Sequence, residues 1–290
     1  MKSHALKRLQ YGEKGAKLLF LISATVSIVA VVFICLFLFA GGIPAIFRIG
    51  VGEFLGGISW RPLRELFGIL PMIVGSIYVT AGAIIIGVPT GLLCAVFMAR
   101  FCSQKLYRIL KPIVNLLAGI PSVVYGFFGL TVIVPLMQTL FGGSGKGVAT
   151  ASIVLGIMIL PTIISVSEDA LRAVPETYYA GALALGATHE RSVFCAQLPA
   201  AKSGVTAGVI LGVGRAIGEA LAVSMVAGNQ AVIPTGILGG VRTLTSNIVL
   251  EMGYAAGLHR EALIATGVVL FVFILIINLC FSLLKKGDKK

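Results

Sequence analysis

Six long apolar stretches dominate this sequence and restrict the folds that it can adopt. A helix needs about 20 mostly apolar residues to cross the hydrocarbon core of a bilayer. Within that core a helix satisfies its backbone polar groups internally, which an irregular segment cannot do. The sequence therefore predicts an all-α polytopic membrane protein with six transmembrane helices, at residues 18–40, 68–98, 113–141, 148–166, 204–228 and 262–284.

The positive charges are unevenly distributed along the chain. The net charge is +12, and Lys and Arg gather before the first apolar stretch, after the second and after the last. Cytoplasmic loops of membrane proteins are enriched in Lys and Arg, so this clustering indicates topology rather than a nucleic acid partner. With 58% hydrophobic and only 12% charged residues, the composition also excludes an ordinary soluble domain. We expect both termini to be cytoplasmic.

This topology divides the chain into three parts. Residues 1–67 are expected to hold a cytoplasmic tail, the first transmembrane helix and an exterior loop from residue 41, with Trp60 as an interfacial anchor. Residues 68–284 are expected to form the transmembrane domain, with a polar cytoplasmic segment at 167–203. A basic cytoplasmic tail follows at residues 285–290. The first apolar stretch exceeds the roughly 7 to 15 residues of a signal peptide, so we expect it to be retained.

The fifth apolar stretch carries two charged residues, Arg215 and Glu219. A charge near the middle of a span costs at least ~2.5 kcal/mol, so such residues are usually functional. If residues 204–228 form one continuous helix, the two side chains lie four residues apart on one face and can pair. Gly204, Gly208 and Gly212 recur at every fourth position and predict a smooth face for a neighbouring helix.

Several site classes are absent from the sequence pattern. The five cysteines have no close pair, so neither a disulfide framework nor a metal site is predicted. The turn GGSGKG at 142–147 lacks the Ser or Thr that a phosphate-binding loop needs after its lysine. The three histidines are isolated and are expected to be solvated. We therefore predict a chain that is not an enzyme and has no nucleotide site or cofactor of its own.

The polar segment 167–203 predicts two short helices joined by a glycine corner. Pro175 starts the first helix, and Glu176 then lies near its positive end. Gly186 is suited to a left-handed helix end, and the second helix finishes near Pro199. One interpretation is an amphipathic hairpin that lies on the lipid surface.

This segment resembles the motif of permease subunits of ABC importers, written EAA, three residues, Gly, nine residues, Ile-x-Leu-Pro. The glycine and the closing Leu-Pro are present at the right spacing, but the glutamate is absent and Ala196 replaces the isoleucine. In that family the motif forms coupling helices that dock on an ATPase. The resemblance assigns this role to Ala180, Gly181, Ala182, Gly186, Leu198 and Pro199.

Two further stretches are similar to permeases of phosphate importers, specifically the PstC type. They are LAGIPSVVYGFFGL at 117–130 and GRAIGEALAVSMVAGN at 214–229. The resemblance implies the type I ABC importer permease fold in a bacterial-type inner membrane. It implies as partners a PstA-type permease subunit, two copies of an ATPase that uses ATP and Mg, an extracytoplasmic phosphate-binding protein, and membrane lipid.

The resemblance also associates Arg215 and Glu219 with the passage of phosphate. A guanidinium suits phosphate oxygens, and a carboxylate can accept the proton that HPO4 carries and sulfate lacks. The alternative to a role in transport is that Arg215 and Glu219 form an ion pair that only fixes helix packing. Two alternative functions remain. One is a permease for another oxyanion, molybdate or sulfate. The other is a stand-alone channel or secondary transporter, in which the cytoplasmic segment would have no role.

Overall fold

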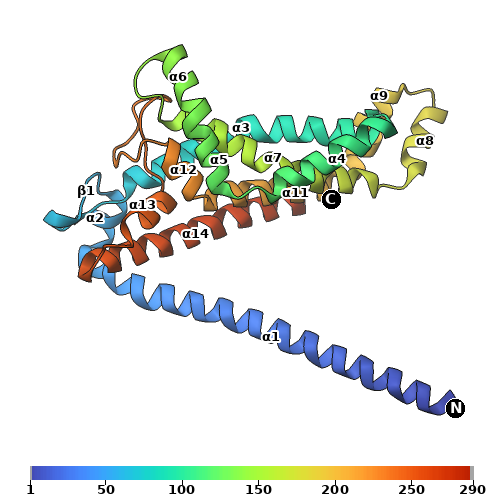
Figure 1. Ribbon diagram of the computed structural model, residues 1–290, viewed down its shortest axis with the longest axis horizontal. Coiled ribbons are helices and arrows are strands. Elements are labelled where there is room, and N and C mark those ends of the chain that lie inside the picture. The colour runs from blue at the N-terminus through green and yellow to red at the C-terminus, as the bar shows by residue number, and fades with distance from the viewer. Residues whose placement is uncertain (1, 288–290) are drawn as a thin grey trace.

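The computed structural model describes the backbone of residues 2–287 and the side chains of residues 16–280. In that part the chain is mostly helical, and its sheet is one short hairpin (Figure 1). The longer helices are α1 (Lys2–Ile49), α3 (Leu70–Val96), α4 (Gln104–Gly119), α7 (Val148–Arg172), α11 (Lys202–Gly218) and α14 (Gly257–Gly287). The shorter helices are α2 (Val51–Gly56), α5 (Ser122–Phe128), α6 (Val134–Phe141), α8 (Glu176–Ala184), α9 (His189–Ser192), α10 (Leu198–Ala200), α12 (Leu221–Val226) and α13 (Leu244–Glu251). The hairpin and tight turns are β1 (Trp60–Arg61), β2 (Leu66–Phe67), the 3-10 turn η1 (Pro62–Arg64) and the π-helical turns η2 (Phe97–Phe101), η3 (Gly129–Ile133) and η4 (Val193–Gln197).

Helix α7 is the most buried span and packs against both α3 and α11 (Figure 1). The small-residue face predicted on α11 is confirmed, because all three of its glycines face α7. A Cβ atom at Gly212 would lie 2.7 Å from Ile163 Cγ1, and one at Gly204 would lie 2.4 Å from Ala170 Cβ. Only glycine therefore allows the two helices to approach this closely.

Five of the six predicted spans overlap a helical segment that could cross a membrane, and the predicted fifth span, 204–228, does not appear with these bounds. Among the described residues, five helical segments are long and apolar enough to cross a membrane. By length and composition, a sixth would arise if His189–Ala200 and Lys202–Gly218, which meet at a bend of 73°, were one span, but residues 189–200 belong to the segment predicted to be cytoplasmic. The five are Ala16–Ile49, Leu70–Phe101, Ser122–Phe141, Val148–Arg172 and Gly257–Cys280.

Two predicted boundaries are wrong. Helix α1 continues past residue 40 to Ile49, because Gly42 fits directly against α14, where an added Cβ would lie 2.6 Å from Val268 Cγ2. The third predicted span, 113–141, is divided: α4 ends at Gly119, and α5 begins only after Pro121. Proline disfavours helical geometry in the residue before it, which accounts for the break.

The loops next to α13 are held by polar contacts around the carboxylate of Glu251. Trp60 is only 7% exposed, and its Nε1 donates a hydrogen bond of 2.8 Å to Glu251 Oε2. His259 Nε2 lies 2.8 Å from the same carboxylate oxygen, and Arg242 Nη1 donates to Oε1 at 2.6 Å. The expectation that Trp60 is an interfacial anchor is therefore wrong, because Trp60 is buried against this carboxylate. The expectation of solvated histidines is wrong for His259, which is half-buried beside the same carboxylate, and for His189, which is half-buried and bonded to Tyr179, whereas the side chain of His4 lies outside the described residues.

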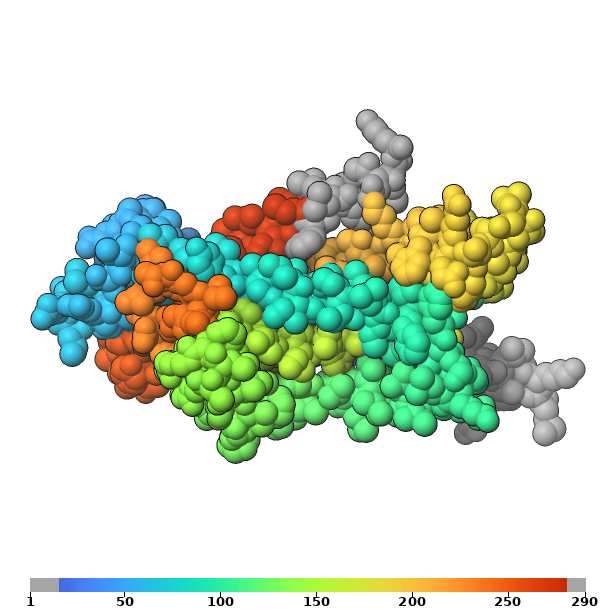
Figure 2. Space-filling view, turned by 90° about the horizontal axis from the view of Figure 1, so that it is seen from above, coloured from blue at the N-terminus to red at the C-terminus, as the bar shows by residue number. Residues whose placement is uncertain are grey.

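The helices give the molecule two distinct ends. Helices α8 and α9 project at one end, hereafter the α8 end, and β1, α2 and the loop before α13 gather at the other, hereafter the α13 end (Figure 2). Helix α1 runs toward the α13 end along the chain, and α14 runs back from there toward the α8 end (Figure 1). The first described residue of α1 and the last of α14 thus lie toward the same side of the membrane domain.

Candidate functional site

The fifth predicted span is not one continuous helix. Helix α11 ends at Gly218, Glu219 has the extended backbone angles φ −72° and ψ 128°, and α12 begins at Leu221. The expectation of an unbroken helix over 204–228 is therefore wrong. The interruption lies directly beside Arg215, in the stretch that carries the predicted site.

Helix α13 donates hydrogen bonds to two carbonyl groups at the break, of which that of Ala220 also accepts from the Ser224 amide at 2.9 Å. Thr245 Oγ1 donates to the Glu219 carbonyl at 2.7 Å, and Ser246 Oγ donates to the Ala220 carbonyl at 3.5 Å. The carboxylate of Glu219 accepts a hydrogen bond from the amide of Ala222 at 3.0 Å and so caps the start of α12. Non-helical backbone at membrane depth is tolerated only when its polar groups are satisfied in this way.

Arg215 and Glu219 do not form the ion pair that their spacing predicts. In the described part of the chain, Arg215 has no carboxylate within ion-pair distance, and its Nη1 donates to Thr162 Oγ1 of α7 at 3.3 Å. The pairing fails because the helix ends before Glu219 and the Glu219 carboxylate turns to α12 instead. Arg215 is half-buried. Because a guanidinium has five N–H donors and no carboxylate of the described residues pairs with this one, donors and positive charge remain available.

The two stretches that resemble phosphate permeases lie side by side. Helix α5, from the first stretch, packs on α12, from the second, and a Cβ at Gly126 would lie 2.8 Å from Ala222 Cα. Tyr125 is buried, and its hydroxyl donates to the Leu117 carbonyl at 2.7 Å, across the break at Pro121. The sequence signatures thus form one packed region around the break in the fifth span.

The segment at the α8 end forms the predicted pair of short helices. We call residues 176–200, from α8 through α10, the knob. Gly186 has φ +84°, so the left-handed corner is confirmed, and Thr188 Oγ1 caps α9 by accepting from the Arg191 amide at 3.3 Å. Leu185 at the tip is 91% exposed. Of the six motif positions, Ala180, Gly181, Gly186 and Pro199 are exposed, and Ala182 and Leu198 are half-buried.

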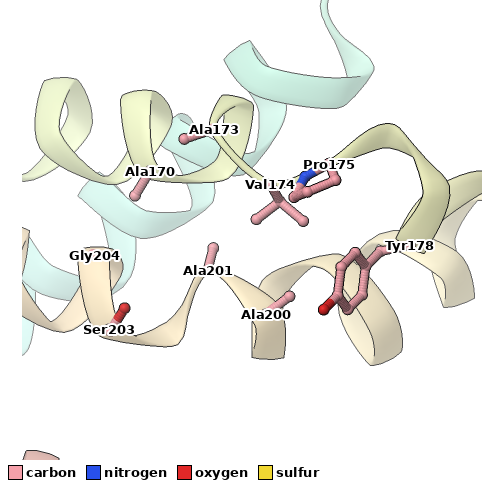
Figure 3. A pocket seen from close by; sticks show the side chains of 9 residues that line it. All are labelled: Ala170, Ala173, Val174, Pro175, Tyr178, Ala200, Ala201, Ser203 and Gly204. Atoms are coloured by element: carbon pink, nitrogen blue, oxygen red, sulfur yellow. The ribbon is translucent and has the colours of Figure 1, made fainter.

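A hollow of about 310 Å³ separates the knob from the spans on one side (Figure 3). Its walls come from the end of α7, the start of α8 and the bend between α10 and α11. Small residues line most of it, with Tyr178 and Pro175 at one end and Ser203 at the other (Figure 3). The knob still contacts α11 beside this hollow, because Val193 and Leu198 pack in one buried cluster with Ala201 and Val205.

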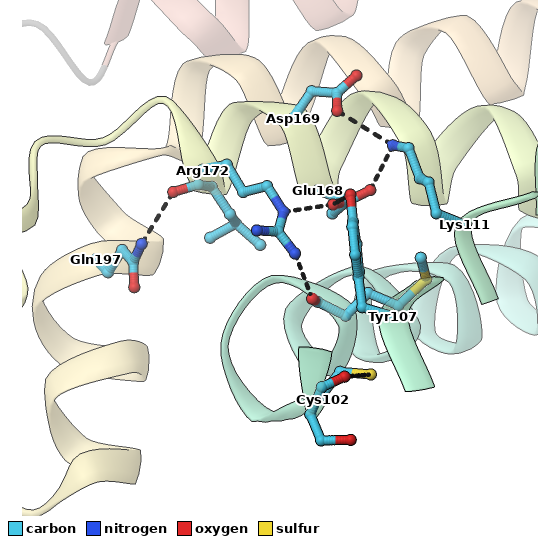
Figure 4. A network of polar contacts seen from close by, with 10 residues as sticks. Cys102, Tyr107, Lys111, Glu168, Asp169, Arg172 and Gln197 are labelled. Carbon is cyan, nitrogen blue, oxygen red and sulfur yellow. Dashed lines mark hydrogen bonds and ion pairs between the residues drawn. The ribbon is translucent and has the colours of Figure 1, made fainter. Parts of the chain in front are cut away.

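A buried carboxylate organises the opposite side of α7 (Figure 4). The Glu168 side chain is fully buried and receives hydrogen bonds from Tyr107 Oη at 2.8 Å, Lys111 Nζ at 2.5 Å and Arg172 Nε at 2.5 Å. Burial and the hydrogen bond to Glu168 together raise the pKa of Tyr107. Burial alone would lower the pKa of Lys111, but its bonds to Glu168 and Asp169 raise it, so the ammonium group stays charged.

Sequence reasoning missed this charge cluster. One feature of the sequence could have indicated it: Glu168 and Arg172 follow an apolar stretch and lie four residues apart, so on a helix their side chains share one face. The third and fourth members, Tyr107 and Lys111, come from α4, and nothing in the local pattern connects them with α7. Thr245 and Ser246 were missed for the same reason, because they contact the break from 26 residues away.

Comparison with known proteins identifies the fold and the family. The model of the family described as binding-protein-dependent transport system inner membrane component matches residues 87–287. The probable ABC transporter permease protein YqgH of Bacillus subtilis is 39% identical over 280 residues, covering 93% of this chain and 91% of that protein. The phosphate transport system permease protein PstC of Mesorhizobium japonicum is 36% identical over 261 residues, covering 83% and 80%. The protein described as a probable PstC of Methanocaldococcus jannaschii is 30% identical and covers 96% and 95%.

Solved structures show a similar fold. A structure of the MetNI methionine ABC transporter in inward-facing conformations contains a chain with a TM-score of 0.58 and 21% identity, covering 80% of this chain and 100% of that one. A chain of an amino acid ABC transporter has a TM-score of 0.55 and 19% identity, covering 81% and 98%. The predicted fold, an all-helical ABC importer permease, is confirmed. The chain is a multi-pass membrane transport subunit and belongs to the binding-protein-dependent transport system inner membrane component family.

Proposed function

We propose that this chain is the permease subunit of an ATP-driven importer and that, with a second permease, it forms the path for inorganic phosphate. Relatives named as phosphate permeases, at 30–36% identity over most of the chain, support this substrate. The observation that carries the proposal is the guanidinium of Arg215, which is half-buried, bonded to the Thr162 hydroxyl and free of a carboxylate partner among the described residues. A charge kept unpaired in a span is suited to an anion that passes through.

Arg215 and Glu219 have different roles in this proposal. Arg215 offers permanently charged donors to the oxygens of phosphate. Glu219 fixes the break, through its bond to the Ala222 amide, and its negative charge favours oxyanions that still carry a proton. In this proposal the second permease completes the path, because the half-buried side chain of Arg215 is still partly exposed on this subunit.

The remaining partners follow from the same proposal. The α8 end is cytoplasmic, both termini are on that side, and the knob docks on an ATPase dimer that uses ATP and Mg, so this chain needs no cofactor. The second permease is of the PstA type, and an extracytoplasmic phosphate-binding protein docks at the α13 end. The exposed positions at Ala180, Gly181 and Gly186 leave room for a neighbouring protein, since nothing lies within 4 Å of a Cβ built at either glycine.

Uptake of labelled phosphate into proteoliposomes that contain the assembled transporter tests the proposal. We expect Arg215→Gln to lower uptake at least about tenfold, because it removes a charged hydrogen-bond donor, and Glu219→Gln to lower it less. Arg48→Gln is the control, since it breaks an exposed ion pair with Glu261 near the other end. Normal uptake by both Arg215 and Glu219 variants in an intact complex would overturn the assignment. Competition by sulfate or molybdate would identify another oxyanion permease, and uptake without an ATPase would identify a channel or secondary transporter.

A further inference from the structure

The end of α3 is unusual, because its last turn, η2, is π-helical. π-helical turns are rare and occur often at functional sites. Met98 in this turn is buried, and its carbonyl accepts a hydrogen bond of 2.9 Å from Arg172 Nη2 (Figure 4). Arg172 in turn binds the buried carboxylate of Glu168. The turn η2 is thus fixed to the charge cluster at the end of α7.

The same turn also holds both helices of the knob. Arg100 Nη1 lies 2.9 and 3.1 Å from the two carboxylate oxygens of Glu176, in the first turn of α8, and its guanidinium lies 5.2 Å from the Tyr179 ring centre. Phe101 packs edge-on against His189 of α9 at 4.6 Å. Tyr179 and His189 are joined by a hydrogen bond of 2.6 Å. Neighbouring residues of η2 therefore connect α8 and α9 to α3.

The two sides of the knob differ in how they are attached. On the η2 side it has an ion pair and stacked rings, whereas the hollow of Figure 3 separates it from the start of α11 on the other side. The knob is also joined to α7 and α11, because Val193 lies in one buried cluster with Leu171 and Val205, and Gln197 Nε2 donates a hydrogen bond of 2.9 Å to the Leu171 carbonyl. The turn η2 is therefore the attachment that connects the knob to α3.

We propose that Arg100 and Glu176 are a positioning pair that transmits movement of the knob to α3 and, through Met98 and Arg172, to the Glu168 cluster on α7. This inference rests on the proposed function, because it assumes that the knob is the segment that an ATPase moves. The pair adds little to folding stability, since Glu176 is 64% exposed. Its contribution is to keep the orientation of the knob coupled to the orientation of the spans.

The test measures ATP hydrolysis and phosphate uptake in the same proteoliposomes, with the complete transporter. In Arg100→Gln and in Glu176→Gln we expect ATP hydrolysis to continue while phosphate transported per ATP falls roughly fivefold, a typical lower bound for coupling between sites. The double variant should be no worse than either single one, since both remove the same interaction. Arg100→Lys keeps the charge and should retain most of the coupling, which a merely structural role of the guanidinium stack does not predict.

Arg48→Gln, which breaks an exposed Arg–Glu pair near the other end, is the matched control and should leave the ratio unchanged. An unchanged ratio in both single variants, or losses that multiply in the double variant, would overturn the pair as a coupling element. If Arg100→Gln fails to assemble, Glu176→Gln decides the question, because its side chain is largely exposed. If the wild-type complex imports a different oxyanion, the ratio is measured with that oxyanion, so a wrong substrate and a wrong coupling pair give separate results.

Discussion

Replacement of Glu168 by glutamine should destabilise the protein more than any other single loss of a carboxylate charge at the α8 end. The glutamine keeps the shape of the side chain and removes the charge that Lys111, Arg172 and Tyr107 share. Glu168 is fully buried, so water cannot replace the lost interactions at its position.

The size of the effect follows from what each partner retains. Removing one member of a fully buried ion pair costs about 3–5 kcal/mol, because the other charge stays buried. Here Arg172 is 41% exposed and keeps its bond to the Met98 carbonyl, while Lys111 is 23% exposed and keeps Asp169. Both cations are therefore partly compensated, and we expect a loss at the lower end of that range, about 3 kcal/mol.

Reversible unfolding of the purified chain in mixed detergent and SDS micelles measures this loss. Tyr107→Phe removes a single hydrogen bond to the carboxylate and should cost about 1.5 kcal/mol. Glu190→Gln is the control, because its carboxylate is fully exposed at the surface of α9, and stability should change far less than in Glu168→Gln. A Glu168→Gln variant as stable as wild type would refute the view that this carboxylate holds the α8 end together.

Three further substitutions test other parts of the fold. Gly186→Val puts a branched side chain at φ +84° and should lower the phosphate transported per ATP. Gly181→Ala, where a Cβ meets no neighbour, should not lower it. Equal transport per ATP in the two variants would contradict this expectation. Thr245→Val removes the hydroxyl that binds the Glu219 carbonyl and should cost about 1 kcal/mol in SDS unfolding; an unchanged midpoint would count against a clamp at the break. Gly42→Leu should force α1 from α14, seen as lost cross-linking between engineered cysteines on the two helices.

Local chemistry accounts for the features that were predicted correctly. A span is recognisable because its length and hydropathy must match the bilayer, whatever it packs against. The left-handed turn at Gly186 is equally local, since glycine alone lacks the Cβ that disfavours it. The face of Gly204, Gly208 and Gly212 was visible for the same reason: a repeat of four residues places small residues on one side of any helix.

The features that were predicted wrongly depend on distant partners. The segment around Glu219 contains no proline, and Gly218 alone does not specify a break, since Gly208 and Gly212 lie within the same helix. The carbonyls of Glu219 and Ala220 accept hydrogen bonds from Thr245 and Ser246 of another helix. Tryptophan is a residue type that is common at membrane interfaces, but the indole of Trp60 is buried and donates a hydrogen bond to Glu251. In each case a contact between residues far apart in the sequence outweighs the local preference.

The sequence by itself therefore determined the class of the protein, the approximate spans and the two short helices with their glycine corner, since these follow from hydropathy, charge and backbone geometry. Only the tertiary structure decided how Arg215 and Glu219 are used. Spacing on an ideal helix pairs them, but the chain leaves the helix at Glu219, which then caps α12 while Arg215 turns to Thr162. The physical reason is that Thr245 of α13 donates a hydrogen bond to the Glu219 carbonyl, which allows the helix to end there. A hydrogen bond between elements far apart in the chain produces no periodic pattern in the sequence.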